Sequence, residues 1–216
     1  MSDPASPSHP EALPGAPKVR RGRGRRPTAE VHAEILTAAG DLLLTRGMAE
    51  FTIEGVADLA GVSKTTIYKS WSSKGALALA GYFHVVQATL AFPDTGDVTA
   101  DLTAQLRAFI ALLTQTPAGR AVAELIGEAQ TDPELMVAFL DRYTDPRRRL
   151  AVEAMTLAIT RGQLRPDIDP QVVVDQLWGA CYHRLLIPSL PLTEDFADAL
   201  VHNLTHGVTI TDQPPL

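Results

Sequence analysis

Cysteine is almost absent from this 216-residue sequence, and long apolar runs are missing altogether. The single cysteine, Cys181, excludes an intrachain disulfide framework; its apolar neighbours predict an inert buried thiol. No stretch approaches the roughly 18 consecutive apolar residues of a membrane-spanning helix. Residues 1–17 lack the basic start and apolar run of a signal peptide. We therefore expect a cytoplasmic protein that does not enter a membrane.

Positive charge is also scarce overall, which argues at first against nucleic acid as a partner. The formal net charge is −6, from 19 Lys and Arg against 25 Asp and Glu. The charges are unevenly placed, however: residues 18–74 carry ten basic and six acidic side chains, and residues 75–216 carry nine and seventeen. Because attraction to phosphate depends on the local field, this asymmetry indicates a basic DNA-binding module joined to an acidic body.

The first 26 residues form a segment of their own by composition. Five prolines lie in residues 1–17, among small residues that cannot bury enough surface to offset the entropy of ordering, which predicts a disordered tail. Six positive charges follow in residues 18–26. Such a run is often only a solubilising tail. Directly before a DNA-binding helix, it favours an arm in which Arg23, Arg25 and Arg26 reach the minor groove.

The remaining chain has the periodicity of helices. Apolar residues recur at three- and four-residue spacing, and no segment alternates long enough to predict a strand, so the fold class is all-α. Thr28 is the expected N-cap of the first helix, and Asp145-Pro146 marks a bend or break. The expected helices span residues 28–47, 52–61, 63–71, 72–83, 102–116, 121–132, 133–145, 146–162, 170–187 and 193–206.

The strongest functional signal is a helix-turn-helix pattern in residues 51–77. Two short helices that cross steeply need a small residue at the crossing, here Ala57, and a glycine at the turn, here Gly61. The apolar anchors on each side are Val56, Val62 and Ile67. The polar side chains that this arrangement leaves facing outward are Lys64, Thr65, Thr66, Tyr68 and Lys69.

With these features in register, the segment resembles the DNA-binding domain of the TetR family of bacterial repressors. The resemblance runs from about residue 28 to residue 79. It rests on an opening threonine, a small-residue turn, two aromatic residues and a lysine, which are Thr52, Ala60-Gly61-Val62-Ser63, Tyr68, Trp71 and Lys74. Gly75 stands where glutamate is common, and Trp71 replaces the more frequent phenylalanine. Neither departure threatens the assignment.

The resemblance implies a role for each polar residue of this segment. Those expected to bind phosphates are Thr52, Tyr68 and Lys74, with Ser70 also at the DNA backbone. Those expected to read base edges in the major groove are Lys64, Thr65, Thr66 and Lys69. The implied organisation is a tail with a basic arm (residues 1–26), a three-helix DNA-binding domain (27–72) and a helical regulatory and dimerisation domain (73–216).

The second half of the chain is matched by helix count rather than by motif. The resemblance implies a homodimer formed by the last two helices, which would let two reading helices bind a palindrome of double-stranded DNA. It also implies a small apolar or amphipathic effector whose binding releases the DNA. The candidate pocket residues are Tyr82, Phe83, Phe109, Trp178, Cys181, Tyr182 and His183.

Other interpretations account for less of the sequence. A buried helical hairpin without a DNA role does not explain the basic arm and the lysines. An all-helical enzyme is disfavoured because no catalytic triad, phosphate loop or metal-ligand set is visible, and no cofactor is expected. His202 and His206 have a spacing that could share a metal but lack a third ligand, so no metal is expected. The three arginines of residues 147–149 predict a solvated helix start. An architectural DNA binder that uses the arginine arm stays an alternative.

Overall fold

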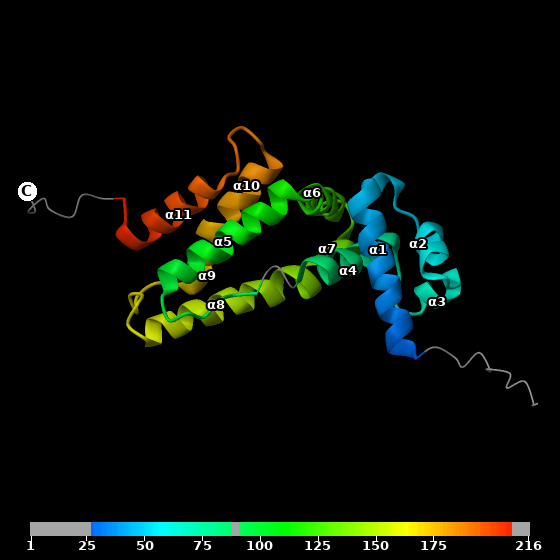
Figure 1. Cartoon of the computed structure of the whole chain (residues 1–216), viewed down its shortest axis with the longest axis horizontal. Coiled ribbons are helices and arrows are strands. Elements are labelled where there is room, and N and C mark those ends of the chain that lie inside the picture. Colours follow the sequence, from blue (N-terminus) through cyan, green and yellow to red (C-terminus); the bar gives the residue numbers. More distant parts are fainter. Residues whose placement is uncertain (1–26, 88–90, 209–216) are drawn as a thin grey trace, which may run out of the picture.

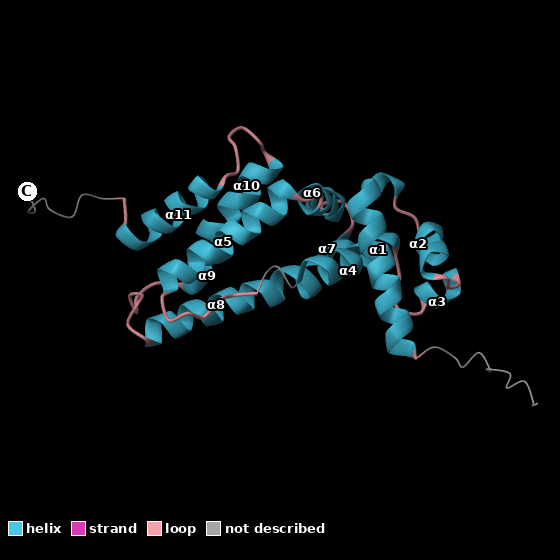
Figure 2. Ribbon diagram, viewed as in Figure 1, coloured by secondary structure: helices cyan, strands magenta, loops and turns pink. Residues whose placement is uncertain are grey.

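A computed structural model describes residues 27–87 and 91–208, and every regular element in these two ranges is a helix. The helices are α1 (Thr28–Glu50), α2 (Ile53–Ala60), α3 (Lys64–Tyr68), α4 (Lys74–Val86), α5 (Val98–Gln115), α6 (Ala118–Ala129), α7 (Pro133–Phe139), α8 (Asp145–Thr160), α9 (Pro170–Val174), α10 (Ala180–Leu186) and α11 (Glu194–His206). Two π-helical turns, η2 (Leu140–Thr144) and η3 (Asp175–Gly179), join α7 to α8 and α9 to α10. The all-α prediction is confirmed (Figure 2).

The helices form two groups along the molecule. Figure 1 shows α1, α2 and α3 gathered at one end, while the later helices extend away toward α11 at the opposite end. Helix α4 packs along α1 and also contacts α6 and α7, so it belongs to both groups. Helix α3 therefore lies at one end of a molecule whose two groups of helices are joined through α4.

Two glycines bring α1 and α4 into close contact. A Cβ atom added to Gly81 of α4 would lie 2.6 Å from the backbone nitrogen of Gly40 in α1. Such a separation is below any real carbon–nitrogen contact, so these helices can approach this closely only without a side chain at Gly81. The two glycines therefore fix the distance between α1 and the body.

Side-chain caps set the start of most helices. Hydroxyl or carboxylate oxygens accept hydrogen bonds from the first-turn backbone N–H groups at Thr52, Ser63, Ser73, Asp97, Asp132, Asp169 and Thr193. The first helix differs from the expectation. Thr28 is its first helical residue, and the residue at the N-cap is Pro27, which makes no side-chain cap. Helix α3 is also shorter than expected, because it ends at Tyr68 and not near Trp71.

The expected interruption at Asp145-Pro146 takes the form of a π-helical turn instead of a break. Pro146 has no N–H to donate to the preceding turn, and its ring crowds that turn's carbonyl. The chain responds by widening: the N–H of Asp145 bonds to the carbonyl of Leu140, five residues back. Helix α8 then starts at Asp145 with Pro146 in its first turn, where proline is tolerated.

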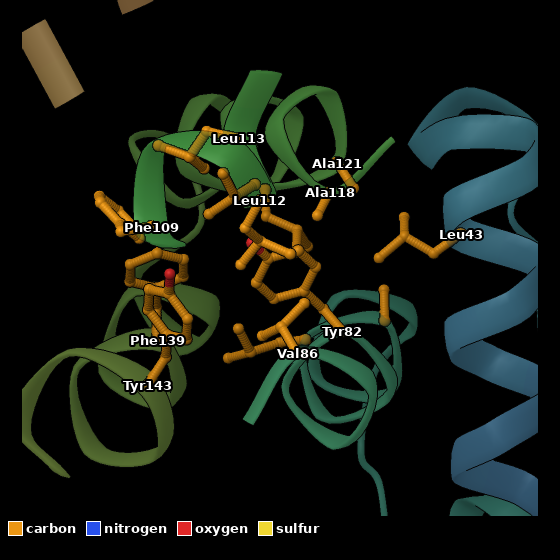
Figure 3. Packing of buried hydrophobic residues seen from close by; sticks show 14 of the residues in the cluster. Leu43, Tyr82, Val86, Phe109, Leu112, Leu113, Ala118, Ala121, Phe139 and Tyr143 are labelled. Carbon is orange, nitrogen blue, oxygen red and sulfur yellow. The ribbon is translucent and has the colours of Figure 1, made fainter. Parts of the chain in front are cut away.

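The core is continuous from α1 to the body. Figure 3 shows buried side chains from α1, α4, α5, α6, α7 and η2 meeting around Tyr82. Tyr82 is fully buried, and its ring lies 5.7 Å from that of Tyr143 in an edge arrangement. Because burial strongly disfavours the charged form, the pKa of Tyr82 is raised well above its usual range.

Candidate functional site

The turn between α2 and α3 has the backbone that a helix-turn-helix needs. Gly61 adopts a left-handed conformation (φ 62°, ψ 40°), which a β-carbon would strain. Its neighbour Val62 donates a backbone hydrogen bond to the carbonyl of Ala57 at 3.0 Å, closing the end of α2. Ser63 then caps α3 by accepting from the N–H of Thr66 at 3.2 Å. Turn and cap together fix the direction in which α3 leaves.

Helix α3 is anchored by one buried side chain and is polar elsewhere. Ile67 is fully buried, and Trp71, just beyond the helix, stacks on His32 of α1 with ring centroids 4.4 Å apart. Trp71 thus fills the place of the more common phenylalanine with a ring contact to α1. Of the residues predicted to read bases, Lys64, Thr65 and Lys69 are exposed and Thr66 is half-buried. Tyr68 and Ser70, which are predicted to contact the DNA backbone, are exposed too.

Two of these side chains already have partners on the protein. The Nζ atom of Lys64 donates to the Oε1 atom of Glu54 in α2 at 2.7 Å. This pair raises the pKa of Lys64 and lowers that of Glu54, so both groups are charged at neutral pH. The hydroxyl of Thr66 lies 3.0 Å from that of Ser63. Lys64 and Thr66 are therefore held in place before any DNA is bound.

Two of the residues expected at phosphates, Thr52 and Lys74, lie at helix starts. The Oγ1 atom of Thr52 accepts from the N–H of Gly55 at 3.0 Å, which leaves its own hydroxyl proton free to donate. The Nζ atom of Lys74 donates to the carbonyl of Met48 at 3.1 Å, near the end of α1. Gly75 has a steric reason for lacking a side chain, because a Cβ there would lie 3.0 Å from Leu135 of α7.

The basic arm precedes the first described residue. Arg23, Arg25 and Arg26 lie outside the described residues, so their contact with the minor groove stays a prediction.

A second candidate site is an apolar cavity of about 370 Å³ in the body. It lies between α5, α6, the α7–η2–α8 segment and the α9–η3–α10 segment, and both π-helical turns border it. The aromatic side chains in its wall are Phe92, Phe109, Phe139, Tyr143, Trp178 and Tyr182. This volume and lining suit a small aromatic or acyl molecule.

The structure brings some of the candidate pocket residues to this cavity and places others elsewhere. Of the candidate residues, Phe109, Trp178 and Tyr182 line it, whereas Tyr82, Phe83, Cys181 and His183 do not. Phe83 packs edge-on against Tyr143 at 6.4 Å, one layer behind the wall. Cys181 is fully buried, and burial raises the pKa of its thiol to about 12, so it stays protonated at neutral pH.

The predicted solvated helix start at residues 147–149 is wrong for two of the three arginines. Arg147 and Arg148 both line the cavity, and only Arg149 is fully exposed. Arg148 forms an ion pair with Asp175 and a 3.0 Å hydrogen bond to Oε1 of Gln171. Helical spacing alone does not reveal this, because the π-helical turn before α8 changes which side chains face inward.

The hydroxyls of Tyr143 and Tyr182 meet at 2.9 Å in the cavity wall. Burial raises the pKa of Tyr182 well above its usual range, so this phenol is neutral under all physiological conditions. The pair offers hydrogen-bonding groups inside an otherwise apolar surface.

Helix α6 connects the cavity to the first group of helices. Ile126 and Ala129 of α6 line the cavity. On the same helix, the carboxylate of Glu124 accepts from the backbone N–H of Met48 at 2.6 Å, where α1 ends. Arg120, one turn earlier, donates to the carbonyl of Leu44 at 3.3 Å. A single helix thus contacts both the cavity and the end of α1.

A metal-ligand cluster and a membrane-spanning helix are both absent from the described residues. No cluster of three His, Cys, Asp or Glu side chains is placed there to hold a metal ion. His202 and His206 stack with ring centroids 4.3 Å apart, and Nδ1 of His206 lies 2.9 Å from the Thr205 hydroxyl. Within residues 27–87 and 91–208, no helix combines the length and the apolar character that crossing a bilayer requires.

Comparison with known proteins accounts for both halves of the chain. The family model for "Bacterial regulatory proteins, tetR family" matches residues 35–80. The model for "Tetracyclin repressor-like, C-terminal domain" matches residues 92–204.

Individual relatives agree. YdeS, an uncharacterized HTH-type transcriptional regulator of Bacillus subtilis (strain 168), is 35% identical over 189 residues, which cover 88% of this chain and 95% of YdeS. The DNA-binding transcriptional repressor TetR of Mycobacteroides abscessus is 30% identical over 173 residues, which cover 80% of this chain and 90% of that repressor. The crystal structure of the TetR family transcription regulator SCO0332 superposes with a TM-score of 0.80 at 61% identity, covering 84% of this chain and 100% of that one. The chain therefore belongs to the TetR family of bacterial transcriptional regulators.

Proposed function

We propose that this regulator is a repressor that binds palindromic operator DNA as a homodimer and is released by a small apolar or amphipathic molecule. The observation that carries the proposal is α3 itself. Its single buried anchor, Ile67, and its cap, Ser63, hold a short helix whose other side chains are polar and mostly exposed. A helix of this kind at one end of the molecule fits the major groove.

Within this proposal, the side chains of α3 and its flanks divide into two groups. Lys64, Thr65, Thr66 and Lys69 contact base edges, because their donors and acceptors match the pattern in the major groove. Thr52, Tyr68, Ser70 and Lys74 contact the DNA backbone and fix the register. The arm residues Arg23, Arg25 and Arg26 add minor-groove contacts.

The test is DNA binding by a chain in which the exposed face of α3 is removed. Thr65, Tyr68 and Lys69 are replaced together by alanine, and fluorescence anisotropy measures affinity for DNA that flanks the regulator's own gene. Because each good base contact contributes about 1–3 kcal/mol, we expect specific affinity to fall at least about tenfold. Arg149→Ala, which removes one exposed positive charge far from α3, is the control and should change affinity less than about twofold. Unchanged affinity in the triple variant would contradict the proposal.

Dimerisation is supported by apolar surface near the end of α10. Leu186, Ile187 and Leu190 are exposed there, and Val172 of α9 is exposed too. A salt bridge between Arg107 of α5 and Asp198 of α11 (Nε to Oδ1, 2.8 Å) fixes α11 against its own subunit. The outer surfaces of α10 and α11 are therefore available to a second copy.

Effector response follows from the position of α6. A molecule in the cavity contacts Ile126 and Ala129, and a shift of α6 is transmitted through Glu124 to the end of α1. DNA and effector then favour different spacings of the two α3 helices, and binding of one weakens binding of the other.

A further inference from the structure

One arginine nitrogen in the cavity wall lacks a hydrogen-bond partner among the described residues. The Nη1 atom of Arg147 is buried and has no hydrogen-bond partner in the part of the chain that the structure describes. Leaving a charged donor buried and unsatisfied is costly, more so than for a neutral group. A hydrogen-bond acceptor placed beside this nitrogen would remove that cost.

Among the described residues, Arg147 contacts aromatic faces and forms no ion pair with a carboxylate. Its guanidinium carbon lies 5.5 Å from the ring centroid of Phe109 and 5.3 Å from that of Tyr143, and both rings line the cavity. These are cation–π distances, which stabilise the charge without satisfying its N–H groups. Burial keeps the nearby phenol of Tyr182 neutral by raising its pKa, so a tyrosinate does not balance the charge.

The neighbouring arginine shows the contrast. Arg148 also borders the cavity, but Asp175 and Gln171 satisfy its guanidinium. The cavity therefore contains two arginines and one paired carboxylate, Asp175, and one positive charge is left over at Arg147. The rest of the wall is mainly aromatic and aliphatic, and its neutral polar groups are Gln130, Thr144 and the tyrosine hydroxyls. A bound molecule that fits this wall and balances the charge is therefore mainly apolar and carries one anionic group.

We propose that Arg147 anchors the anionic group of an effector with a flat aromatic body, such as an aromatic carboxylate or sulfonate. The anion accepts hydrogen bonds from the Arg147 guanidinium, and the aromatic body packs among Phe109, Tyr143 and Trp178. This inference rests on the proposed effector function and specifies the chemical class that the cavity selects.

The experiment uses two fluorescent probes that share an aromatic skeleton and differ in charge. 1-Anilinonaphthalene-8-sulfonate carries an anionic group, and N-phenyl-1-naphthylamine lacks it. Both are titrated into the full chain, into Arg147→Gln and Arg147→Lys, and into Arg149→Gln, which removes the same charge at an exposed position two residues away. Thermal melting and DNA binding without any probe are measured on each variant.

We expect Arg147→Gln to weaken binding of the sulfonate at least about tenfold, because a hydrogen bond to a charged group is lost. The affinity for the neutral probe should change less than about threefold. Arg149→Gln should change the affinity for neither probe. The affinity of Arg147→Lys for the sulfonate should lie between those of the unmodified chain and Arg147→Gln. Lysine keeps the positive charge but lacks the planar guanidinium that donates two parallel hydrogen bonds.

Three results would overturn the inference: equal loss of both probes, no loss of either, or no saturable binding of the sulfonate to the unmodified chain. The DNA measurement keeps this separate from the proposed function. A chain that binds DNA normally but fails these tests is still a regulator, whereas loss of specific DNA binding by the unmodified chain would refute the repressor proposal itself.

Discussion

At the scale of single residues, the pairing of Lys64 with Glu54 shows how the protein positions a reading side chain. The Lys64 ammonium is held 2.7 Å from the carboxylate, and both side chains are more than half exposed. An exposed pair of this kind contributes little to stability. In the proposed DNA complex, the pair restrains the lysine and places a negative charge beside the phosphates.

Removing that negative charge should strengthen DNA binding. We expect Glu54→Gln to raise affinity about two- to fivefold at neutral pH, where the lowered pKa of Glu54 keeps it ionised. The measurement is anisotropy over a range of salt concentrations. Glu194→Gln, at the far end of the chain, serves as the matched control. Weaker binding by Glu54→Gln would contradict this expectation and show that the restraint on Lys64 contributes more to binding than the negative charge of Glu54 costs.

Cys181 should be chemically silent in the folded protein. With its pKa raised to about 12 and its side chain fully buried, the thiol is neither ionised nor accessible at pH 8. We expect reaction with a disulfide reagent to be at least about a hundredfold slower than in guanidinium-unfolded protein. Equal rates would show that the α9–η3–α10 segment opens readily.

The sequence predicted the residues of α3 better than those of the cavity. Ser63, Gly61 and Ile67 act through local geometry, so their spacing was sufficient. Arg147 depends on contacts with Phe109, 38 positions away along the chain, and on the π-helical turn before it. A run of arginines contains no local sign of this burial.

At the scale of elements, the approach of α4 to α1 is a close steric constraint. Gly81→Ala should lower the free energy of unfolding by about 1–3 kcal/mol, because its Cβ would collide with the Gly40 backbone. Urea unfolding provides the measurement. The control is Gly127→Ala in α6, where a Cβ meets nothing within 4 Å and the gain in helix propensity should stabilise by about 0.5–1 kcal/mol. Similar effects at both positions would contradict the close packing of α1 and α4.

The existence of helices can be predicted from the sequence, whereas their continuity cannot. Capping residues such as Ser73 and Thr193 start helices where the local pattern indicates. The pattern around Pro146 predicts a bend or break, yet the segment stays helical through a π-helical turn. Whether a proline breaks a helix or widens one of its turns depends on the packing around it. Here the π-helical turn before Pro146 contains Tyr143, which is buried in the core. The periodicity of the sequence does not reveal such packing.

At the scale of the whole molecule, the proposed dimer interface lies near the end of α10. Ile187→Glu together with Leu190→Glu should place charges in the proposed interface and shift the protein toward monomer in sedimentation velocity. DNA affinity should fall with it, because a monomer reads only one half-site. Leu59→Glu, which places a charge at an exposed apolar position of α2, is a matched control that should leave the oligomeric state unchanged. A stable dimer in the double variant would place the interface elsewhere.

The charge distribution also belongs to this scale. A net charge of −6 for the chain coexists with a basic excess in residues 18–74, because the acidic residues are concentrated in the body. Charge and motif together therefore predict from the sequence alone which part of the chain binds DNA. They do not reveal that α6 connects that end of the molecule to the cavity, because this depends on contacts between residues far apart in the chain.

If two copies of α3 read one operator, footprinting on DNA that flanks the regulator's own gene will show it. We expect a protected stretch with two-fold symmetry, its half-sites separated by whole helical turns. That protection should disappear when Thr65, Tyr68 and Lys69 are replaced by alanine. An asymmetric footprint, or one that persists in the triple variant, would mean that two copies of α3 do not read the operator.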